Sequence, residues 1–247
     1  MPTEDTEDTE KSFGFYDSTY SLLAVPTTWT EQPIHFIDFE GSVSSGIVEY
    51  GVATLHDGAV LAAHTRLCQP NGRMRKEDIE IHGLDETALV GATPMADDFA
   101  AFSEWRKTGP LGAHFAGAEN SLLKSVWPYP RSSPDFARLD RSSTEWGPWV
   151  DTGALYRQFY PQLESYKLAD LVAICGLQEE LDGLADQHCP PERRQYHAAL
   201  YDALAGAVLL LSLAKEPTVA VMTTMQLLAL STLDGDKRDA MQQGNLF

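Results

Sequence analysis

The sequence predicts an α/β fold built on a mixed β-sheet, and two patterns in its 247 residues carry this prediction. Dense apolar and aromatic runs joined by short turns come first, which is typical of consecutive antiparallel strands. Shorter apolar runs then alternate with segments of helical periodicity, which is typical of strands and helices packed in layers. We therefore expect one domain over about residues 34–215, with a sheet of about five strands, the first three antiparallel, flanked by helices.

The three antiparallel strands are expected at the start of this domain. Residues 34–40, Ile-His-Phe-Ile-Asp-Phe-Glu, form a dense apolar run that suits a buried strand. A turn rich in glycine and serine leads to a second strand over 47–55. His-Asp-Gly at 56–58 then predicts a hairpin turn before a third strand over 60–68.

The rest of the domain is predicted to alternate between helices and two further strands. Helices are indicated where apolar residues recur at helical spacing, and the stretch 128–147, rich in proline and serine, is expected to be a loop. The predicted helices or turns cover 77–84, 94–107, 120–127, 167–176, 194–215 and 222–231. A fourth strand is predicted over 111–115, and a fifth strand that runs into a helix is predicted over 147–155.

The charge balance limits how this protein could hold nucleic acid. The chain has 18 Lys and Arg against 36 Asp and Glu, which gives a formal net charge of −18. This excess of acid argues against a broad basic surface that grips long nucleic acid. It does not exclude a nucleic-acid enzyme, because metal ions could supply the missing positive charge at a short strand end.

The chain ends and the cysteines predict a soluble, cytoplasmic protein without membrane contact. Residues 1–33 are expected to be an acidic leader and surface segment, without the apolar core of a signal peptide, and residues 216–247 a C-terminal extension. The longest apolar run, 203–214, is too short to span a bilayer. The three cysteines share no metal-binding spacing and fit a reducing compartment.

A pair of acids ends the first predicted strand. Asp38 and Glu40 are two residues apart, so they lie on the same face of a strand. Two carboxylates on one face of an otherwise apolar strand are unfavourable to bury without cations. The alternative is a strand end whose acids are solvated.

Further acids and a histidine follow in similar settings. Glu119 comes after the fourth predicted strand, at the start of a helix. His197 and Asp202 are five residues apart on the predicted helix 194–215, somewhat over one turn, so both can lean toward one site. The alternative for this pair is a satisfied structural contact in a buried helix.

Five segments, taken in order, resemble the signature of one nuclease family. The segments are 36–41 (Phe-Ile-Asp-Phe-Glu-Gly), 81–84 (Ile-His-Gly-Leu), 113–119 (Ala-His-Phe-Ala-Gly-Ala-Glu), 150–156 (Val-Asp-Thr-Gly-Ala-Leu-Tyr) and 196–202 (Tyr-His-Ala-Ala-Leu-Tyr-Asp). Together they resemble the DEDDh 3′–5′ exonucleases, the superfamily of the proofreading epsilon subunit and exodeoxyribonuclease X. The resemblance covers about residues 34–214, and the final segment is most similar to that of exodeoxyribonuclease X.

The resemblance implies a ribonuclease H-like fold and a metal-dependent 3′–5′ exonuclease. Such an enzyme hydrolyses terminal phosphodiesters of single-stranded DNA or DNA 3′ ends and releases nucleoside monophosphates in repair or proofreading. Asp38, Glu40 and Asp202 would hold two divalent cations, with Glu119 as a further ligand, and hard oxygen ligands suit Mg²⁺ or Mn²⁺. His197 would accept the proton of the attacking water as general base.

The sequence departs from the family pattern within 113–119. The family usually has Asp where Glu119 stands and often Asn where Phe115 stands. Glu is one methylene longer and can still ligate, directly or through water, so the departure predicts a weaker second metal, lower activity or a changed metal preference. The alternative is that Glu119 only begins its helix, where a negative charge is favourable.

The resemblance also implies a place for the last nucleotide of the substrate. The implied substrate-binding residues are Phe39, Gly41, Ser42, His82, Leu84 and Phe115. The backbone around the first three would cradle the nucleotide, and His82 and Leu84 would wedge it. A base of any kind could stack on Phe39 or Phe115, and core packing is the open alternative for both rings. Asp151 is interpreted as a structural residue that caps the helix after it.

The last residues of the chain resemble a second motif. Gln243, Leu246 and Phe247 form Gln-x-x-Leu-Phe, which is similar to the pentapeptide with which bacterial replication and repair proteins bind the sliding clamp. Apolar residues at the end of a polar tail have no evident folding role, which favours a use in binding. The alternative is a chance pentapeptide.

Two other functions stay open at this point. An exoribonuclease of the same fold would share the site residues, and the clamp-like tail is what favours DNA. A catalytically weakened module that only docks on the clamp would explain Glu119. Such a module would retain Asp38, Glu40, His197 and Asp202 without metals, and buried acids without metals destabilise a fold.

Overall fold

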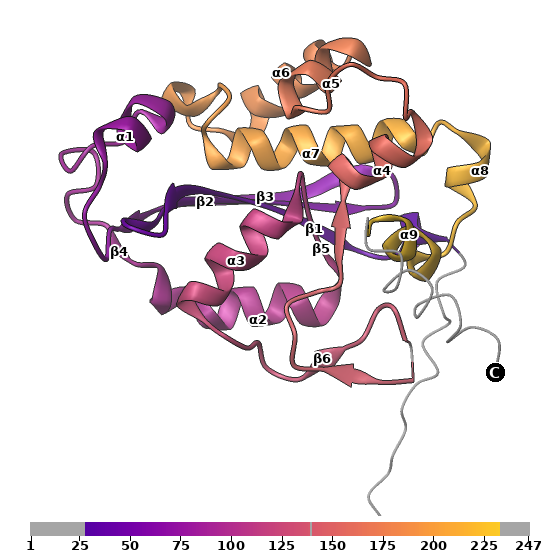
Figure 1. Cartoon of the computed structure of the whole chain (residues 1–247), viewed down its shortest axis with the longest axis horizontal. Coiled ribbons are helices and arrows are strands. Elements are labelled where there is room, and N and C mark those ends of the chain that lie inside the picture. The colour runs from indigo at the N-terminus through magenta and orange to yellow at the C-terminus, as the bar shows by residue number, and fades with distance from the viewer. Residues whose placement is uncertain (1–27, 139, 233–247) are drawn as a thin grey trace, which may run out of the picture.

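The computed structural model describes residues 28–138 and 140–232 (Figure 1). Most of the predicted acidic leader lies outside these residues, and so do Gln243, Leu246 and Phe247 of the clamp-like tail. Among the helices of the described ranges, none has the length and apolar character needed to cross a membrane.

The centre of the fold is a six-stranded mixed sheet in the order β4-β3-β2-β1-β5-β8. Strands β1 (Ile34–Ser42), β2 (Gly46–His56) and β3 (Ala59–Gln69) pair antiparallel, and β5 (Leu111–Ala113) and β8 (Trp149–Asp151) continue the sheet parallel to β1. The predicted α/β class and the antiparallel start are confirmed. The sixth strand, β4 (Thr93–Pro94), was not predicted, because two residues carry no periodicity.

Helices cover both faces of this sheet (Figure 1). On one face α7 (Ala199–Leu213) packs on β1 and β2, and α5 (Leu168–Ile174) and α6 (Gln178–His188) pack on α7. On the other face α2 (Phe99–Thr108) and α3 (Ala116–Val126) close a second core. The remaining elements are α1 (Lys76–His82), α4 (Thr152–Phe159), α8 (Pro217–Ala220), α9 (Thr224–Leu230), the 3₁₀ turns η1 (Trp29–Glu31), η2 (Met95–Asp98) and η3 (Pro191–Arg193), and the hairpin β6 (Ser133–Pro134) with β7 (Ser142–Ser143).

The alternation of β1 side chains divides the two cores. Phe36 enters the core under α7, while Ile37 and Phe39 enter the core under α2 and α3. Asp38 and Glu40 are in phase with Phe36, so the acids lie on the α7 side of the sheet. The sequence pattern predicted this shared face.

Gly51 on β2 allows α7 to begin directly against the sheet. A Cβ atom at Gly51 would lie 2.2 Å from the backbone nitrogen of Leu200, which is far inside van der Waals contact. This close approach brings the first turn of α7, with Asp202, over the acidic end of β1.

The predicted helix 194–215 is wrong at its start. Helix α7 begins at Ala199, and the residues between η3 and α7 form a turn in which His197 has a φ of 64°. His197 therefore precedes the helix that carries Asp202, and the two do not share a helical face. Helix α6 was not predicted, since only Leu181 and Ala185 of it are buried and its apolar periodicity is weak.

Candidate active site

Four carboxylates from three elements converge at the end of β1. Asp38 and Glu40 come from β1, Glu119 from the first turn of α3 and Asp202 from the first turn of α7. Glu40, Glu119 and Asp202 expose 8%, 7% and 9% of their surface. Repulsion from Glu119, Asp202 and Glu40 is among the causes that raise the pKa of Asp38, which indicates that the four side chains lie near one another. We call these four residues the carboxylate cluster.

Burial makes the charged forms of the cluster unfavourable. Desolvation, followed by repulsion from Asp202, raises the pKa of Glu40 to about 8. Desolvation also raises the pKa of Glu119 to about 8, and that of Asp202 to about 7. The pKa of Asp38 lies well above its ordinary value because of burial and then repulsion from Glu119. Ionisation of all four carboxylates is therefore unfavourable unless cations balance their negative charge.

Unpaired oxygens in the cluster fit divalent cations. Oε2 of Glu119 and Oδ1 of Asp202 are buried and have no hydrogen-bond partner among the described residues. Buried polar atoms of native proteins are normally paired, and these two oxygens are free to accept a cation. Carboxylate oxygens are the donors that Mg²⁺ and Mn²⁺ prefer. The residues present therefore fit divalent cations.

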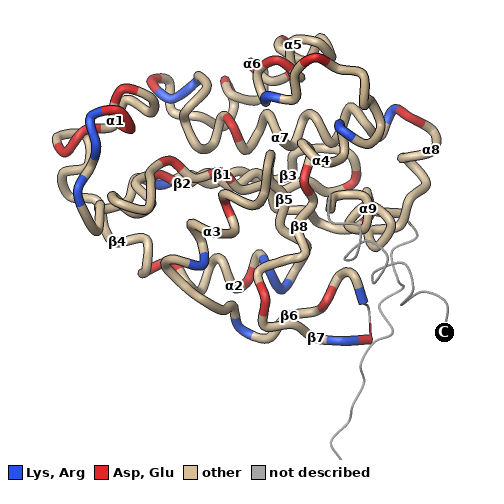
Figure 2. Tube along the Cα trace, viewed as in Figure 1, with Lys and Arg blue, Asp and Glu red and all other residues tan. Residues whose placement is uncertain are grey.

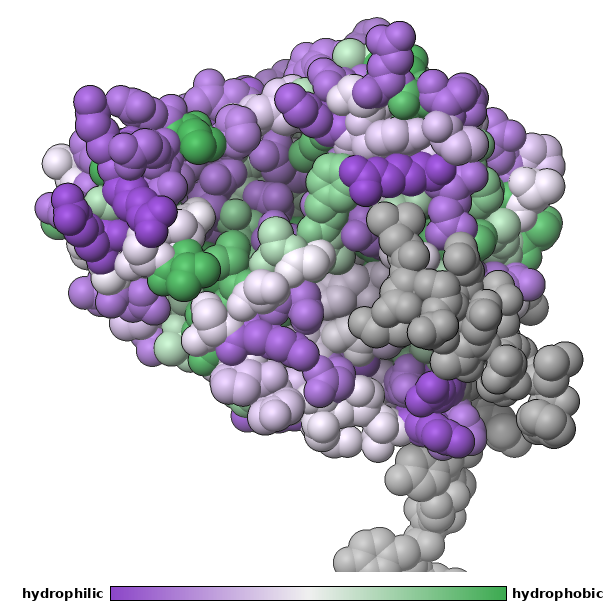
Figure 3. All heavy atoms as spheres, viewed as in Figure 1, coloured by the Kyte–Doolittle hydropathy of each residue, from purple (hydrophilic) through white to green (hydrophobic). Residues whose placement is uncertain are grey.

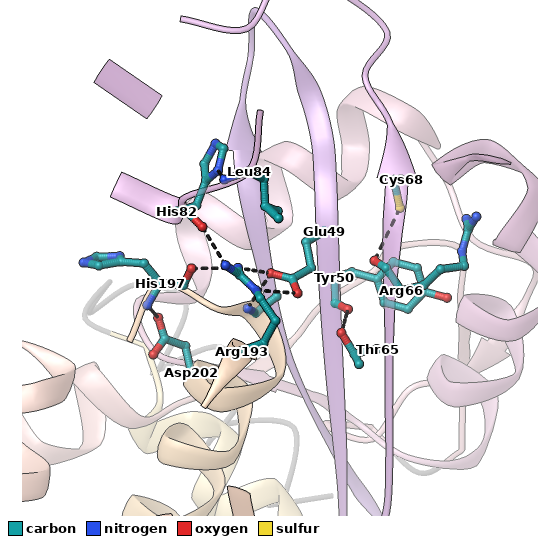
Figure 4. Close-up of polar contacts among 11 residues, drawn as sticks. Glu49, Tyr50, Thr65, Arg66, Cys68, His82, Leu84, Arg193, His197 and Asp202 are labelled. Atoms are coloured by element: carbon teal, nitrogen blue, oxygen red, sulfur yellow. Dashed lines mark hydrogen bonds and ion pairs between the residues drawn. The ribbon is translucent and has the colours of Figure 1, made fainter. Parts of the chain in front are cut away.

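His197 lies at the exposed edge of the cluster. One ring nitrogen and one carboxylate oxygen each of Glu40 and Asp202 lie within 4.8 Å of one another. The backbone N–H of His197 donates to Oδ2 of Asp202 at 3.0 Å, which fixes the turn on α7. In Figure 4 the backbone carbonyl of His197 faces Arg193, and the ring of His197 points away from Arg193. His197 and Asp202 lie side by side, as predicted. A turn before α7 brings them together, and they do not share a helical face.

Two charged residues beside the cluster were missed by the sequence reasoning. Glu49 on β2 is 3% exposed and forms an ion pair with Arg193, whose Nη2 lies 2.5 Å from Oε2. Arg193 also donates to the carbonyls of His82 and His197 (Figure 4). A charged residue in the middle of the apolar strand 47–55 was the available signal for Glu49.

His82 and Leu84 form a wall beside this ion pair. Both side chains are buried, and Nδ1 of His82 accepts a hydrogen bond from the backbone N–H of Leu84 at 3.1 Å. Leu84, Glu49 and Arg193 line a pocket of about 350 Å³. The structure thus places the predicted wedge residues beside the Glu49–Arg193 ion pair, and their contact with a nucleotide stays a prediction.

The two predicted stacking rings have different settings. Phe39 is 6% exposed and packs on Phe102, with ring centroids 6.0 Å apart, on the face opposite Asp38 and Glu40. The stacking interpretation of the Phe39 ring is therefore wrong, and core packing describes it. Phe115 is 36% exposed, has a φ of 60° and lies 5.0 Å from the guanidinium of Arg157. Its ring stays accessible to a base.

Gly41 and Ser42 shape the turn that follows the acids of β1. Gly41 has a φ of 130°, and a Cβ there would lie 2.2 Å from the carbonyl oxygen of Gly46, so a side chain is excluded. The backbone N–H of Ser42 donates to Oγ of Ser45 at 3.0 Å. These contacts hold the backbone beyond Glu40 in a narrow, fixed turn.

Asp151 has the structural role that the sequence predicted. Its Oδ1 accepts the backbone N–H of Ala154 at 3.0 Å and so caps α4. The same carboxylate accepts the backbone N–H groups of Phe115 and Ala116. It therefore ties the start of α3, which carries Glu119, to β8.

Comparisons with known proteins agree with this architecture. No family model matches the chain. DNA polymerase III PolC-type of Oceanobacillus iheyensis is 23% identical over 201 residues, which is 81% of this chain but 12% of that protein. The chain thus spans only a small part of the curated relatives that it matches.

Two solved structures share the fold. One, described as Exonuclease X in complex with 5′ overhanging duplex DNA, has a TM-score of 0.58 and 20% identity, and the match covers 81% of this chain and 99% of that one. The other is the nuclease domain of 3′hExo, a DEDDh family member, bound to rAMP, with a TM-score of 0.56, 15% identity, and 78% and 96% covered. The fold predicted from the five segments, that of the DEDDh exonucleases, is confirmed.

Proposed function

We propose that this chain is a metal-dependent 3′–5′ exonuclease that hydrolyses terminal phosphodiesters of DNA and releases nucleoside monophosphates in repair or proofreading. The observation that carries the proposal is the convergence of three buried carboxylates and the partly buried Asp38 at one end of β1, with His197 beside Glu40 and Asp202. The activity is assigned to residues 34–215. A fold alone does not fix a function, so the proposal depends on this site.

Asp38, Glu40, Glu119 and Asp202 would hold two divalent cations, Mg²⁺ or Mn²⁺. When bound, the cations supply the positive charge that polarises the scissile phosphate and the attacking water. Asp38 would be one of these ligands, on the same face of β1 as Glu40. The unpaired oxygens of Glu119 and Asp202 support their role as ligands.

Residues of the chain itself carry out proton transfer and bind the last nucleotide. The imidazole of His197, exposed beside Glu40 and Asp202, accepts the proton of the attacking water. The turn at Gly41 and Ser42 and the wall of His82 and Leu84 bound the space for the last nucleotide. Phe115 offers a base an accessible ring, and stacking of this kind is tolerant of sequence.

A small cationic loop gives an acidic protein a place to hold a phosphate backbone. Arg73, Arg75 and Lys76 are exposed in the segment that leads into α1, where Figure 2 shows Lys and Arg gathered. Figure 3 shows hydrophilic side chains at this end of the molecule. Asn71 at the start of the segment donates its N–H to the carbonyl of Ser45, so the loop lies beside the turn that follows β1.

DNA is favoured over RNA by two relatives. Exonuclease X was solved with duplex DNA, and the curated relative is a DNA polymerase. The 3′hExo domain was solved with rAMP, so an exoribonuclease is the rival function. The predicted contact of Gln243, Leu246 and Phe247 with a sliding clamp stays a prediction from the sequence, tested by clamp pull-down with and without the last two residues.

A denaturing-gel time course tests the proposal. DNA and RNA oligonucleotides of one sequence, labelled at the 5′ end, are incubated with Mg²⁺ or Mn²⁺ and with wild type, Asp38→Ala or Asp140→Ala. Asp140 is 82% exposed by side chain and serves as the matched control. Shortening from the 3′ end with wild type and Asp140→Ala, but not with Asp38→Ala, supports the nuclease. Faster loss of RNA would favour the rival, and no shortening with either metal would refute both.

A further inference from the structure

Arg193 connects three elements that meet at the site. Its Nη1 donates to the carbonyl of His82 at 2.6 Å, at the end of α1. Its Nε donates to Oε1 of Glu49 on β2 at 3.2 Å, and its Nη2 donates to the carbonyl of His197 at 2.9 Å. One guanidinium therefore fixes the wall, the sheet and the turn before α7 (Figure 4).

Glu49 completes this connection from the other side. Oε2 of Glu49 accepts the backbone N–H of Ala199 at 3.1 Å as well as Nη2 of Arg193. The carboxylate thus holds both Arg193 and the first residue of α7. Unlike the carboxylate cluster, Glu49 has a cation as direct partner, so it has no need of a metal.

The turn at His197 needs such support. A φ of 64° is unfavourable for a residue with a side chain and persists where surrounding contacts impose it. The N–H of His197 is held by Asp202, and its carbonyl is held by Arg193. The imidazole of His197 is exposed, so no packing around the ring holds it. The backbone conformation therefore sets the direction in which the side chain leaves the chain.

We propose that Arg193, anchored by Glu49, is a positioning residue that acts through His197. The inference rests on the proposed nuclease function for its catalytic consequence. Arg193 makes no hydrogen bond to the four carboxylates in the described residues, although its charge favours the ionised forms of Glu40 and Asp202. Arg193→Lys keeps that charge, so the substitution tests the aiming of the proton acceptor. Lysine cannot replace it, because an ammonium lacks the planar fork that reaches three acceptor groups at once.

The test is a cycle of Arg193→Lys, His197→Ala and the double variant, with kcat and KM measured on one DNA oligonucleotide. Loss of a general base lowers kcat by about 10²- to 10⁴-fold, and misplacing it by about 1 Å can cost about 10²-fold. We expect Arg193→Lys to lower kcat by about 10²-fold alone and by less than about 2-fold in the His197→Ala background. A change in KM caused by displacement of His82 does not depend on His197. It should therefore appear both in the wild-type background and in the His197→Ala background.

The matched control is Arg106→Lys. Arg106 is fully buried and donates to the carbonyls of Pro134, Glu145 and Gly147, and among the described residues it forms no hydrogen bond or ion pair with the carboxylate cluster. This variant should lower Tm and leave kcat unchanged. Equal losses of kcat for Arg193→Lys in both His197 backgrounds would overturn the proposal, since a general loss of structure acts independently of the proton acceptor.

Hydrogen exchange separates the proposal from the proposed function. Arg193→Lys, or Glu49→Gln if the first variant does not fold, should speed amide exchange over residues 197–202 while the centre of α7 stays protected. If wild type degrades no DNA, the nuclease assignment fails, and faster exchange in this segment still supports the positioning of the turn. Unchanged exchange would overturn the positioning of the turn whether or not the chain is a nuclease.

Discussion

Replacing Glu119 by Gln should stabilise the metal-free protein at alkaline pH. Burial raises the pKa of Glu119 from 4.5 to about 8, so the folded state holds this proton more tightly than the unfolded chain does. For a raised carboxyl, the free energy of unfolding falls as pH rises between these two values. Glu119 therefore destabilises the metal-free fold increasingly from about pH 4.5, with the full effect reached above about pH 8, and a neutral amide removes that effect.

The size of the effect follows from the pKa. A rise from 4.5 to about 8 corresponds to about 5 kcal/mol, at about 1.4 kcal/mol per pKa unit. The four carboxylates share their mutual repulsion, and water can enter a metal-free site. One substitution therefore recovers only part of this free energy. We expect about 2 kcal/mol, which raises Tm by about 4–8 °C in a protein of this size.

Thermal unfolding in EDTA at pH 5.5 and pH 8.5 measures this difference, with Glu86→Gln on the exposed surface as the control. Buried histidines act in the opposite direction. The pKa of His35 falls to about 4 by desolvation, so its contribution is lost as pH drops below about 6.5. That contribution is the same in wild type and Glu119→Gln and cancels in the comparison. A Tm of Glu119→Gln at or below wild type at pH 8.5 would refute the electrostatic reasoning.

Three further predictions concern the metal, the cationic loop and the packing of α7. Glu119→Asp introduces the residue usual in the DEDDh exonucleases that the sequence resembles, and we expect a changed ratio of Mg²⁺- to Mn²⁺-supported activity in the gel assay; an unchanged ratio would argue against Glu119 as a ligand. Replacing Arg73, Arg75 and Lys76 by Ala should weaken DNA binding to an Asp38→Ala background and flatten its log–log salt dependence by about 0.7 per lost phosphate contact, measured by anisotropy. An unchanged slope would place the strand elsewhere. Gly51→Ala should lower stability by about 1–3 kcal/mol in denaturant unfolding, because its Cβ would meet the Leu200 backbone; an unaltered midpoint would contradict the close approach.

The sequence predicted the sheet well because its strands carry local patterns. The run at 34–40 and the hairpin turn at 56–58 contain their own signals, and the shared face of Asp38 and Glu40 follows from the two-residue period of a strand. The choice of core for Phe39 follows from the same period. The two-residue period places the ring of Phe39 on the opposite face of the strand from Asp38 and Glu40, which is incompatible with the stacking interpretation.

The start of α7 could not be predicted from local pattern. No helix breaker stands between Glu192 and Ala199, so composition alone allows a helix through His197. The start is fixed by carboxylates elsewhere in the fold, Glu49 on the N–H of Ala199 and Asp202 on the N–H of His197. Glu49 finds its partner Arg193 at a separation of 144 residues, which no short motif reveals.

The central claim is that the carboxylate cluster is a site for two divalent cations on which the nuclease depends. The most direct measurement is a Mn²⁺ titration of the full chain at pH 8, by calorimetry or by electron paramagnetic resonance of free Mn²⁺, beside Asp38→Ala. We expect about two bound ions per wild-type chain and a loss of binding when Asp38 is removed. Wild-type protein that binds no Mn²⁺, or binds it equally well without Asp38, would contradict it.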